Sequence, residues 1–442
     1  MTTQRLTVIG TGYLGATHAA CMAELGYDVL GMDVDAEKIR RLNAGELPFF
    51  EPDLEPLLQK QLATGRLRFT TSFEEVAAFA DVHFVCVGTP QKIGEYAADM
   101  SYVDAAIDGL APFLTSGCLV VGKSTVPVRS AERLAGRLID RAPAGAAVEL
   151  AWNPEFLREG FAIIDTLEPD RLVFGIGVEG GRAERILREL YEPVISQGTP
   201  VIVADLQTAE LVKVAANAFL ATKISFINAM AEVCEAVGAV VTALAKALSY
   251  DDRIGGKFLG PGLGFGGGCL PKDIRAFMAR AGELGVDQAL SFLREIDAIN
   301  IRRRVRMVDM AREQVGGIFT NRKVAVFGAA FKPNSDDVRD SPALDVAEII
   351  RRQGATVTVY DPQAMANARR KCPELRFGAT AFEAAADADL VLHLTEWQEF
   401  REMDPDALRA VVRVPAIVDG RNILDAVAWR EKGWTYRALG RP

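Results

Sequence analysis

The chain has 442 residues, of which 49% are hydrophobic and 25% are charged, a composition typical of a globular protein with a sizeable core. Its length predicts about three domains, because single cores rarely grow beyond about 300 residues. The formal net charge of −9 argues against nucleic acid or an anionic membrane as the main partner. We expect no apolar run that approaches the roughly 18 residues needed to span a bilayer.

Two features bear on the compartment. The six cysteines are thinly spread and show no Cys-x-x-Cys pairing, so we expect neither a disulfide framework nor a zinc or other metal site. The first residues lead directly into a strand without the hydrophobic region of a signal peptide. We therefore expect a cytoplasmic protein.

The N-terminal segment has the pattern of a dinucleotide-binding unit. A strand over Arg5–Ile9 runs into Gly10-Thr11-Gly12-Tyr13-Leu14-Gly15, a helix is predicted over 16–25, and a second strand over 27–32 ends at Asp33. The glycines permit a tight turn and close approach of a pyrophosphate to the helix N-terminus. Asp33 would accept the ribose hydroxyls, and because no arginine follows it we predict NAD rather than NADP. A strand, turn and helix without a ligand is the alternative.

The α/β alternation continues with buried strands over 81–87 and 118–123. Thr89, Ser124 and Thr125 follow these strands directly. Ligands of doubly wound sheets bind beyond the carboxyl ends of the strands, so we place these three residues at the cofactor site.

A further strand ends near Asn153, and Glu155 and Glu159 follow it. If this segment is helical, the two acids lie four residues apart on one face. A solvated acidic face is the ordinary explanation, but the position after a strand end favours a functional role.

A last strand of this domain over 201–203 precedes an apolar-periodic segment of more than thirty residues, 205–237, without proline or glycine. This predicts a long helix that serves as a domain connector or a dimer core. Lys213 and Asn217 lie on one face of it, although a lysine among apolar neighbours can simply extend its ammonium to solvent. A shorter helix is predicted over 240–248.

The run Gly264-Phe265-Gly266-Gly267-Gly268-Cys269-Leu270-Pro271-Lys272-Asp273 delivers one cysteine to the start of a predicted helix. Glycines let the backbone approach a ligand closely, and proline suits the first helical turn. The positive end of the helix dipole favours a thiolate, so Cys269 is a candidate nucleophile with Asp273 one turn away. A flexible loop with a buried cysteine is the alternative.

After another long helix over 286–315, a second α/β unit begins with a strand at 323–328, a helix over 343–353 and a strand at 355–362. It lacks the dinucleotide fingerprint and carries Lys332, and later strands at 390–394 and 416–419 support a parallel sheet. We predict a second Rossmann-like domain that binds a different phosphate-bearing ligand. The fold is thus α/β, with domains at 1–204, 205–305 (a central helical dimerisation region with the cysteine loop) and 306–442.

Five motifs occur together in one known family: the glycine fingerprint, the cysteine loop, Asn153-Pro154-Glu155-Phe156-Leu157-Arg158-Glu159-Gly160, Phe331-Lys332 and Asp419-Gly420-Arg421-Asn422. Over nearly its whole length the chain resembles the UDP-glucose/GDP-mannose dehydrogenases. The resemblance implies oxidation of a sugar primary alcohol to a carboxylate with two NAD⁺ and a cysteine-bound intermediate. UDP-glucose is the expected substrate. Because Gly-Cys-Leu-Pro stands where many UDP-glucose enzymes have Ser-Cys-Phe, GDP-mannose or a UDP-N-acetylhexosamine stays open.

The resemblance also implies residue roles. Cys269 would capture the aldehyde, Lys213 and Asn217 would stabilise the oxyanion, and Thr125, Glu155 and Asp273 would position water or move protons. Glu159 would lie near both cofactor and sugar, Arg339 would reach the cofactor, and Lys38 stands where relatives carry an arginine against the adenine ribose. The further substrate contacts would be Phe156, Leu157, Phe258, Leu259, Gly264, Phe265, Gly266, Phe331, Lys332 and Arg421.

Arg253 matches an arginine that reaches the sugar nucleotide from a neighbouring subunit, which implies at least a homodimer. The three histidines, His18, His83 and His393, stand at none of the motifs, so we expect them to be structural. A non-catalytic sensor of NAD or sugar nucleotide is the alternative from another class, but a sensor needs no nucleophile.

Overall fold

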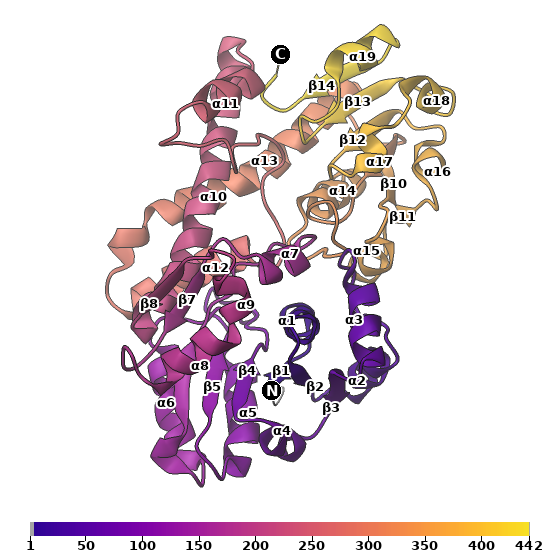
Figure 1. Cartoon of the computed structure of the whole chain (residues 1–442). Coiled ribbons are helices and arrows are strands. Elements are labelled where there is room, and N and C mark those ends of the chain that lie inside the picture. Colours follow the sequence, from indigo (N-terminus) through magenta and orange to yellow (C-terminus); the bar gives the residue numbers. More distant parts are fainter. Residues whose placement is uncertain (1–3, 442) are drawn as a thin grey trace. The chain divides into compact units, whose positions relative to one another are not determined.

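The computed structural model describes residues 4–441 and forms two compact units (Figure 1). Unit 1 comprises the chain up to Ala216 together with Arg275–Leu284, and unit 2 comprises Asn217–Ile274 together with the chain from Gly285 onward. Two helices, α10 (Leu206–Val237) and α12 (Leu270–Glu283), contribute residues to both.

Unit 1 contains an eight-stranded sheet in the order β3-β2-β1-β4-β5-β6-β7-β8. Neighbouring strands are parallel except β6 and β7, which pair antiparallel. The strands are β1 Arg5–Ile9, β2 Asp28–Met32, β3 Leu67–Thr70, β4 Val82–Val85, β5 Leu119–Gly122, β6 Glu149–Trp152, β7 Leu172–Gly175 and β8 Val201–Ala204.

Helices cover both faces of this sheet. Alternate residues of β1 enter different cores: Leu6 and Val8 pack with one helix set, and Ile9 packs with the other. Strands buried on both sides are near-continuously apolar, as β4 and β5 are. The helices of unit 1 are α1 Tyr13–Glu24, α2 Ala36–Asn43, α3 Leu54–Ala63, α4 Phe73–Phe79, α5 Ser101–Leu110, α6 Ser130–Arg141, α7 Ala162–Leu167, α8 Arg182–Leu190 and α9 Glu192–Ile195.

Unit 2 contains an all-parallel six-stranded sheet in the order β11-β10-β9-β12-β13-β14. The strands are β9 Lys323–Phe327, β10 Thr356–Tyr360, β11 Arg376–Phe377, β12 Leu390–His393, β13 Ala416–Asp419 and β14 Thr435–Ala438. The helices wholly within unit 2 are α11 Val241–Ser249, α13 Phe292–Gln314, α14 Pro342–Arg352, α15 Met365–Lys371, α16 Ala381–Ala385, α17 Gln398–Arg401, α18 Pro405–Arg409 and α19 Ala426–Glu431.

Both sheets reverse their strand order at one point, between β1 and β4 in unit 1 and between β9 and β12 in unit 2. Such switch points open a crevice at the carboxyl ends of the strands, where doubly wound folds bind ligands. The predicted fold class is therefore confirmed: two doubly wound parallel-sheet domains joined by a helical region that contains one long helix.

The long helix predicted over 205–237 is confirmed as α10. Two predictions are wrong. The segment after β6 is not helical, because α7 begins only at Ala162. The helix predicted from Val286 begins at Phe292, after a separate 3₁₀ turn over Asp287–Leu290.

Within residues 4–441, α10 is the one helix long and apolar enough to span a membrane, with an 18-residue window of mean hydropathy 1.3. The expectation that no apolar run approaches this length is therefore wrong for this helix. About half of the window is buried inside the protein, and buried polar side chains along it hydrogen-bond to protein groups, as Ser225 and Asn228 do. Core helices of soluble proteins can have this length and composition.

Candidate functional site

The glycine fingerprint follows β1 at the switch point of unit 1. Gly10 has a φ of +88°, and a Cβ there would lie 2.6 Å from Val87. A Cβ on Gly15 would lie 1.8 Å from the carbonyl oxygen of Gly10, so the third glycine permits close packing of α1 on the loop. By contrast, a Cβ on Gly12 would enter open space. This open approach to the N-terminus of α1 is what a pyrophosphate requires.

Asp33 directly follows β2 and lies beside this loop. Its carboxylate accepts hydrogen bonds from Thr11 N at 3.0 Å and from Lys38 Nζ at 2.8 Å. Burial raises the pKa of Asp33, but hydrogen bonds from Lys38 and from backbone N–H groups outweigh it, so the net shift is downward. The group is thus held as a carboxylate, the form that accepts ribose hydroxyls, and Lys38 lies against that carboxylate.

The polar residues after β4 and β5 are tied to one another. Thr89 Oγ1 donates to Thr125 O at 2.6 Å, and Ser124 Oγ donates to Val87 O at 2.6 Å. These bonds join the two strand ends next to the fingerprint. The residues predicted at the carboxyl edge of the sheet are therefore brought together.

The segment that carries Glu155 and Glu159 is irregular, so the two acids do not share a helical face. Glu155 Oε1 lies 3.1 Å from the Nζ of Lys213 on α10, and both side chains are largely buried. Leu157 N donates to the other oxygen of Glu155 at 2.7 Å. The ring of Phe156 lies 5.6 Å from Lys213 Nζ and 3.9 Å from the guanidinium carbon of Arg171. Lys213 therefore pairs with Glu155 and does not reach to solvent.

A buried lysine that no motif singled out as functional holds the start of this segment. Lys123, at the end of β5, donates to Asn153 Oδ1 at 2.8 Å and to Tyr191 Oη at 3.3 Å. Asn153 in turn donates to Val173 O at 3.0 Å. Burial lowers the pKa of Lys123 to about 8. The burial of Lys123 is not apparent from the sequence, because a lysine that follows an apolar strand is expected to be exposed to solvent.

In unit 2, Cys269 directly precedes α12 and is exposed, whereas the other five cysteines are buried. Asp273 lies one turn later and is almost completely buried. Asn217 Nδ2 donates to Asp273 Oδ2 at 2.6 Å, and Lys272 Nζ lies 2.6 Å from Oδ1. An exposed thiol thus stands at a helix N-terminus, where the dipole stabilises negative charge, and a carboxylate fixed by an amide lies on the same helical face.

Glycines in the cysteine loop are required by close packing. A Cβ on Gly266 would lie 2.2 Å from the carbonyl oxygen of Asp340, and one on Gly268 would lie 2.3 Å from the guanidinium of Arg339. Gly267 has a φ of +82°, and its Cβ would lie 2.7 Å from the ring of Phe331. The loop therefore packs against the segment that follows β9.

Side chains of α10 and α13 hold the other side of this loop. Asn300 on α13 accepts from Phe265 N at 2.8 Å and donates to Phe265 O at 2.9 Å. Asn228 on α10 accepts from Gly262 N at 2.8 Å. A Cβ on Gly264 would lie 2.3 Å from Asn300 Oδ1. The loop is therefore held by side chains that are distant in the sequence. This differs from the alternative expectation of a flexible loop with a buried cysteine.

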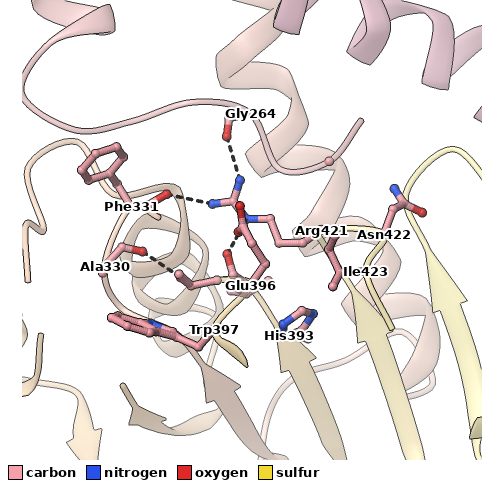
Figure 2. Close-up of polar contacts among 12 residues, drawn as sticks. Gly264, Ala330, Phe331, His393, Glu396, Trp397, Arg421, Asn422 and Ile423 are labelled. Carbon is pink, nitrogen blue, oxygen red and sulfur yellow. Dashed lines mark hydrogen bonds and ion pairs between the residues drawn. The ribbon is translucent and has the colours of Figure 1, made fainter. Parts of the chain in front are cut away.

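Arg421, after β13, spans three loops of unit 2 (Figure 2). It donates to Gly264 O at 3.0 Å, to Phe331 O at 3.1 Å and to Leu394 O at 2.7 Å, and it pairs with Glu396 at 3.2 Å. Its guanidinium therefore ties the cysteine loop to the switch point of the second sheet.

Asp419 holds the turn that carries Arg421 and was not among the predicted site residues. Its carboxylate accepts from the backbone N–H groups of residues 421–424, from Tyr436 Oη, and pairs with His393 Nδ1 at 2.9 Å. Burial raises the pKa of Asp419, but His393 and the backbone donors lower it overall to about 2. In the sequence, the position of Asp419 at the end of a strand and directly before Gly-Arg-Asn is the pattern by which it could have been predicted as a site residue.

Of the remaining predicted ligands, Lys332 and Arg339 follow β9, whereas Arg253, Phe258 and Leu259 lie between α11 and the cysteine loop. Lys332 Nζ lies 5.4 Å from the ring of Phe331, and Arg339 pairs with Asp337 at 2.7 Å. Leu259 is buried, whereas Phe258 is partly exposed with a φ of +65°. Arg253 is almost fully exposed and pairs with Asp251 at 2.7 Å. The turn that carries Arg253 is held by Lys223 of α10, which donates to Ile254 O at 2.9 Å.

Three domain models of one known family match the chain. Residues 4–195 match the NAD binding domain of the UDP-glucose/GDP-mannose dehydrogenase family, residues 207–302 its central domain and residues 325–426 its UDP binding domain. A UDP-glucose 6-dehydrogenase of Rhizobium meliloti (strain 1021) is 42% identical over 99% of this chain and 100% of its own length. The UDP-glucose 6-dehydrogenase TuaD of Bacillus subtilis (strain 168) is 40% identical over 99% and 94%.

Among solved structures, a UDP-glucose dehydrogenase from the archaeon Pyrobaculum islandicum superposes with a TM-score of 0.91 at 37% identity, covering 100% of this chain and 98% of that chain. A UDP-D-ManNAc dehydrogenase from Pyrococcus horikoshii superposes with a TM-score of 0.86 at 28% identity, covering 99% of both chains. The first sheet is thus an NAD-binding domain, and the chain belongs to the UDP-glucose/GDP-mannose dehydrogenase family.

Proposed function

We propose that this protein oxidises C6 of UDP-glucose from the primary alcohol to the carboxylate, with NAD as cofactor. The observation that carries the proposal is the exposed thiol of Cys269 at the start of α12, one turn before an Asp273 held by Asn217. The relatives named as UDP-glucose 6-dehydrogenases match the chain from end to end, which favours UDP-glucose among nucleotide sugars.

The residues of unit 1 fit NAD. The fingerprint glycines and the N-terminus of α1 would receive the pyrophosphate, and the Asp33 carboxylate would accept the adenosine ribose hydroxyls. Thr89, Ser124, Glu159 and, from unit 2, Arg339 are the further proposed contacts. When bound, NAD⁺ supplies the acceptor for two electrons in each oxidation.

Cys269 makes a four-electron oxidation possible without release of aldehyde. After the first oxidation the sulfur adds to the aldehyde carbon, and the oxygen takes the proton, which gives a thiohemiacetal. The second oxidation converts this adduct to a thioester. Water then attacks the thioester carbon, the carbon–sulfur bond breaks, and the acid leaves with the thiol restored.

The remaining side chains hold charge and move protons. An oxygen at C6 becomes negative when it loses its proton, and we assign its stabilisation to the ammonium of Lys213 and to the second N–H of the Asn217 amide. Glu155, paired with Lys213, together with Asp273 and Thr125, would accept a proton or orient the water.

We assign the substrate to the loops around Arg421. Lys332 and Phe331 would contact the nucleotide, and residues 156–157, 258–259 and 264–266 would shape the sugar site. The match of residues 325–426 to a UDP binding domain supports this assignment. The UDP-D-ManNAc dehydrogenase of Pyrococcus horikoshii shares the fold at 28% identity, so a UDP-N-acetylhexosamine is the second candidate substrate.

We further propose a homodimer formed through α10. Exposed apolar side chains of this helix recur every seven residues, at Phe219, Phe226 and Val233, which places them in one stripe. Arg253, exposed on a turn held by α10, would reach the substrate of the partner subunit. The division at 1–204, 205–305 and 306–442, with the middle part as the dimerisation region, and a cytoplasmic location belong to the same proposal.

The decisive experiment measures NADH formed per sugar acid. With limiting UDP-glucose we expect two NADH for each UDP-glucuronate, while GDP-mannose and UDP-N-acetylhexosamines are run in parallel. A ratio of one, with free aldehyde released, would contradict the cysteine route. Turnover of another nucleotide sugar without turnover of UDP-glucose would contradict the substrate assignment.

A further inference from the structure

A buried glutamate outside every predicted site connects the fingerprint to the acidic segment of unit 1. Glu51, in the loop before α3, is only 4% exposed. Its carboxylate accepts from Gly160 N at 2.7 Å and from Ala162 N at 2.8 Å, and it also accepts from the hydroxyl of Tyr13. Three segments more than 30 residues apart in the sequence thus meet at one carboxylate.

The two backbone donors lie at the end of the irregular segment that carries Glu155 and Glu159. This segment has no helix or strand to fix it. Its start is held by Asn153, through Lys123. At its end Gly160 adopts a φ of +81° and turns the chain into α7. The hydrogen bonds to Glu51 hold this turn, because they fix the N–H groups on both sides of Phe161.

The third donor, Tyr13, belongs to the fingerprint itself and begins α1. Burial, reinforced by the hydrogen bond to Glu51 and the charges of Glu51 and Glu159, raises the pKa of Tyr13 far above its usual value. The hydroxyl therefore stays protonated and donates. A carboxylate has several acceptor sites and no donor, so it can serve all three N–H and O–H groups at once.

We propose that Glu51 is a positioning residue that sets the placement of Glu155 and Glu159 and links it to the NAD-binding loop through Tyr13. This inference rests on the proposed function, because that function assigns roles in proton transfer and ligand binding to Glu155 and Glu159. It predicts that loss of the Glu51 carboxylate displaces the acidic segment while the sheet and its fingerprint glycines stay in place.

The test compares Glu51→Gln with Glu55→Gln, a neighbouring exposed glutamate whose carboxylate accepts from Leu47 N at 3.3 Å. An amide has one acceptor oxygen and adds N–H donors, so Glu51→Gln cannot accept from both Gly160 and Ala162 as before. We expect kcat with UDP-glucose to fall by about 10- to 100-fold, with smaller rises in KM for UDP-glucose and in Kd for NAD, because the displaced segment also carries proposed contacts to both ligands. Glu55→Gln should match the parent.

Hydrogen exchange gives a readout independent of turnover. Peptides covering 156–167 should exchange faster in Glu51→Gln, with peptides of β1 and β4 unchanged. If the parent does not oxidise UDP-glucose, the proposed function fails, but exchange still tests the link between Glu51 and the segment. Unchanged kcat and exchange would overturn the inference. A parallel loss of kcat, NAD affinity and thermal stability would also overturn it, because it would show a general structural role.

A second variant, Tyr13→Phe, keeps the inference testable if Glu51→Gln folds poorly. Tyr13→Phe removes only the hydroxyl that donates to Glu51, and we expect a smaller fall in kcat than in Glu51→Gln. Combined with Glu51→Gln it should add less than the sum of the two effects, because both changes act on one network. Strict additivity would overturn the proposed link.

Discussion

At the scale of single residues, Cys269 carries the sharpest prediction. Replacing its sulfur by oxygen in Cys269→Ser removes the nucleophile that forms the thioester but keeps the shape of the side chain. We expect formation of UDP-glucuronate to fall at least about 1,000-fold, with Kd for NAD unchanged by fluorescence titration. Cys372→Ser, at a buried cysteine of unit 2, is the control. Acid formation at the parental rate in Cys269→Ser would contradict the covalent route.

The lowered pKa of Lys123 predicts that the free energy of unfolding depends on pH. Burial lowers its pKa from 10.5 to about 8, although Coulombic interactions with Cys86 and Glu155 act in the opposite direction. Between these values the unfolded chain binds more protons than the folded chain, so this lysine makes the free energy of unfolding rise with pH from about 8 to about 10.5.

Lys123→Met removes this dependence. The difference in unfolding free energy, parent minus variant, should therefore grow by up to about 1.4 kcal/mol per pH unit across that window. Urea denaturation at several pH values between 7.5 and 10 measures it. A difference that stays constant with pH would show that Lys123 keeps an ordinary pKa in the folded protein.

At the scale of elements, the glycines of the cysteine loop should tolerate no side chain. Gly267→Ala must place a Cβ at a φ of +82° and 2.7 Å from Phe331. We expect a loss of about 1–3 kcal/mol in unfolding free energy and a large fall in kcat, since the loop carries Cys269. Gly282→Ala, in α12 where a Cβ meets nothing within 4 Å, should instead stabilise by up to about 1 kcal/mol. Equal behaviour of the two variants in thermal melts would contradict the packing argument.

Elements differ in how far the sequence predicts them. The long helix α10 was predictable because its apolar period runs without proline or glycine, and β1 with its fingerprint because the pattern is local. The segment after β6 was not, since its conformation depends on Glu51, which is 109 residues from Gly160 in the sequence. The hydrogen bonds of Arg421 to Gly264 and Phe331 could not be predicted from the sequence either. Motifs thus identify the residues of the site, whereas the groups that hold them come from distant parts of the chain.

At the scale of the whole molecule, the chain divides its tasks between two doubly wound sheets, each with its own switch point. Unit 1 carries the NAD fingerprint and the acidic segment, and unit 2 carries Cys269 and the loops around Arg421. Helix α10 contributes Lys213 to the first unit and Asn217 to the second, so the two groups proposed to stabilise the oxyanion lie four residues apart in the sequence of one helix.

The proposed dimer follows from the same helix and predicts two separable defects. Phe226→Glu places a charge in the exposed apolar stripe of α10, so we expect sedimentation velocity to show monomers where the parent shows dimers. KM for UDP-glucose should rise in that variant, because the partner's Arg253 would be lost from the site. Arg253→Ala should stay dimeric and raise KM by about tenfold or more. A monomeric parent, or a Phe226→Glu monomer with parental KM, would contradict the shared site.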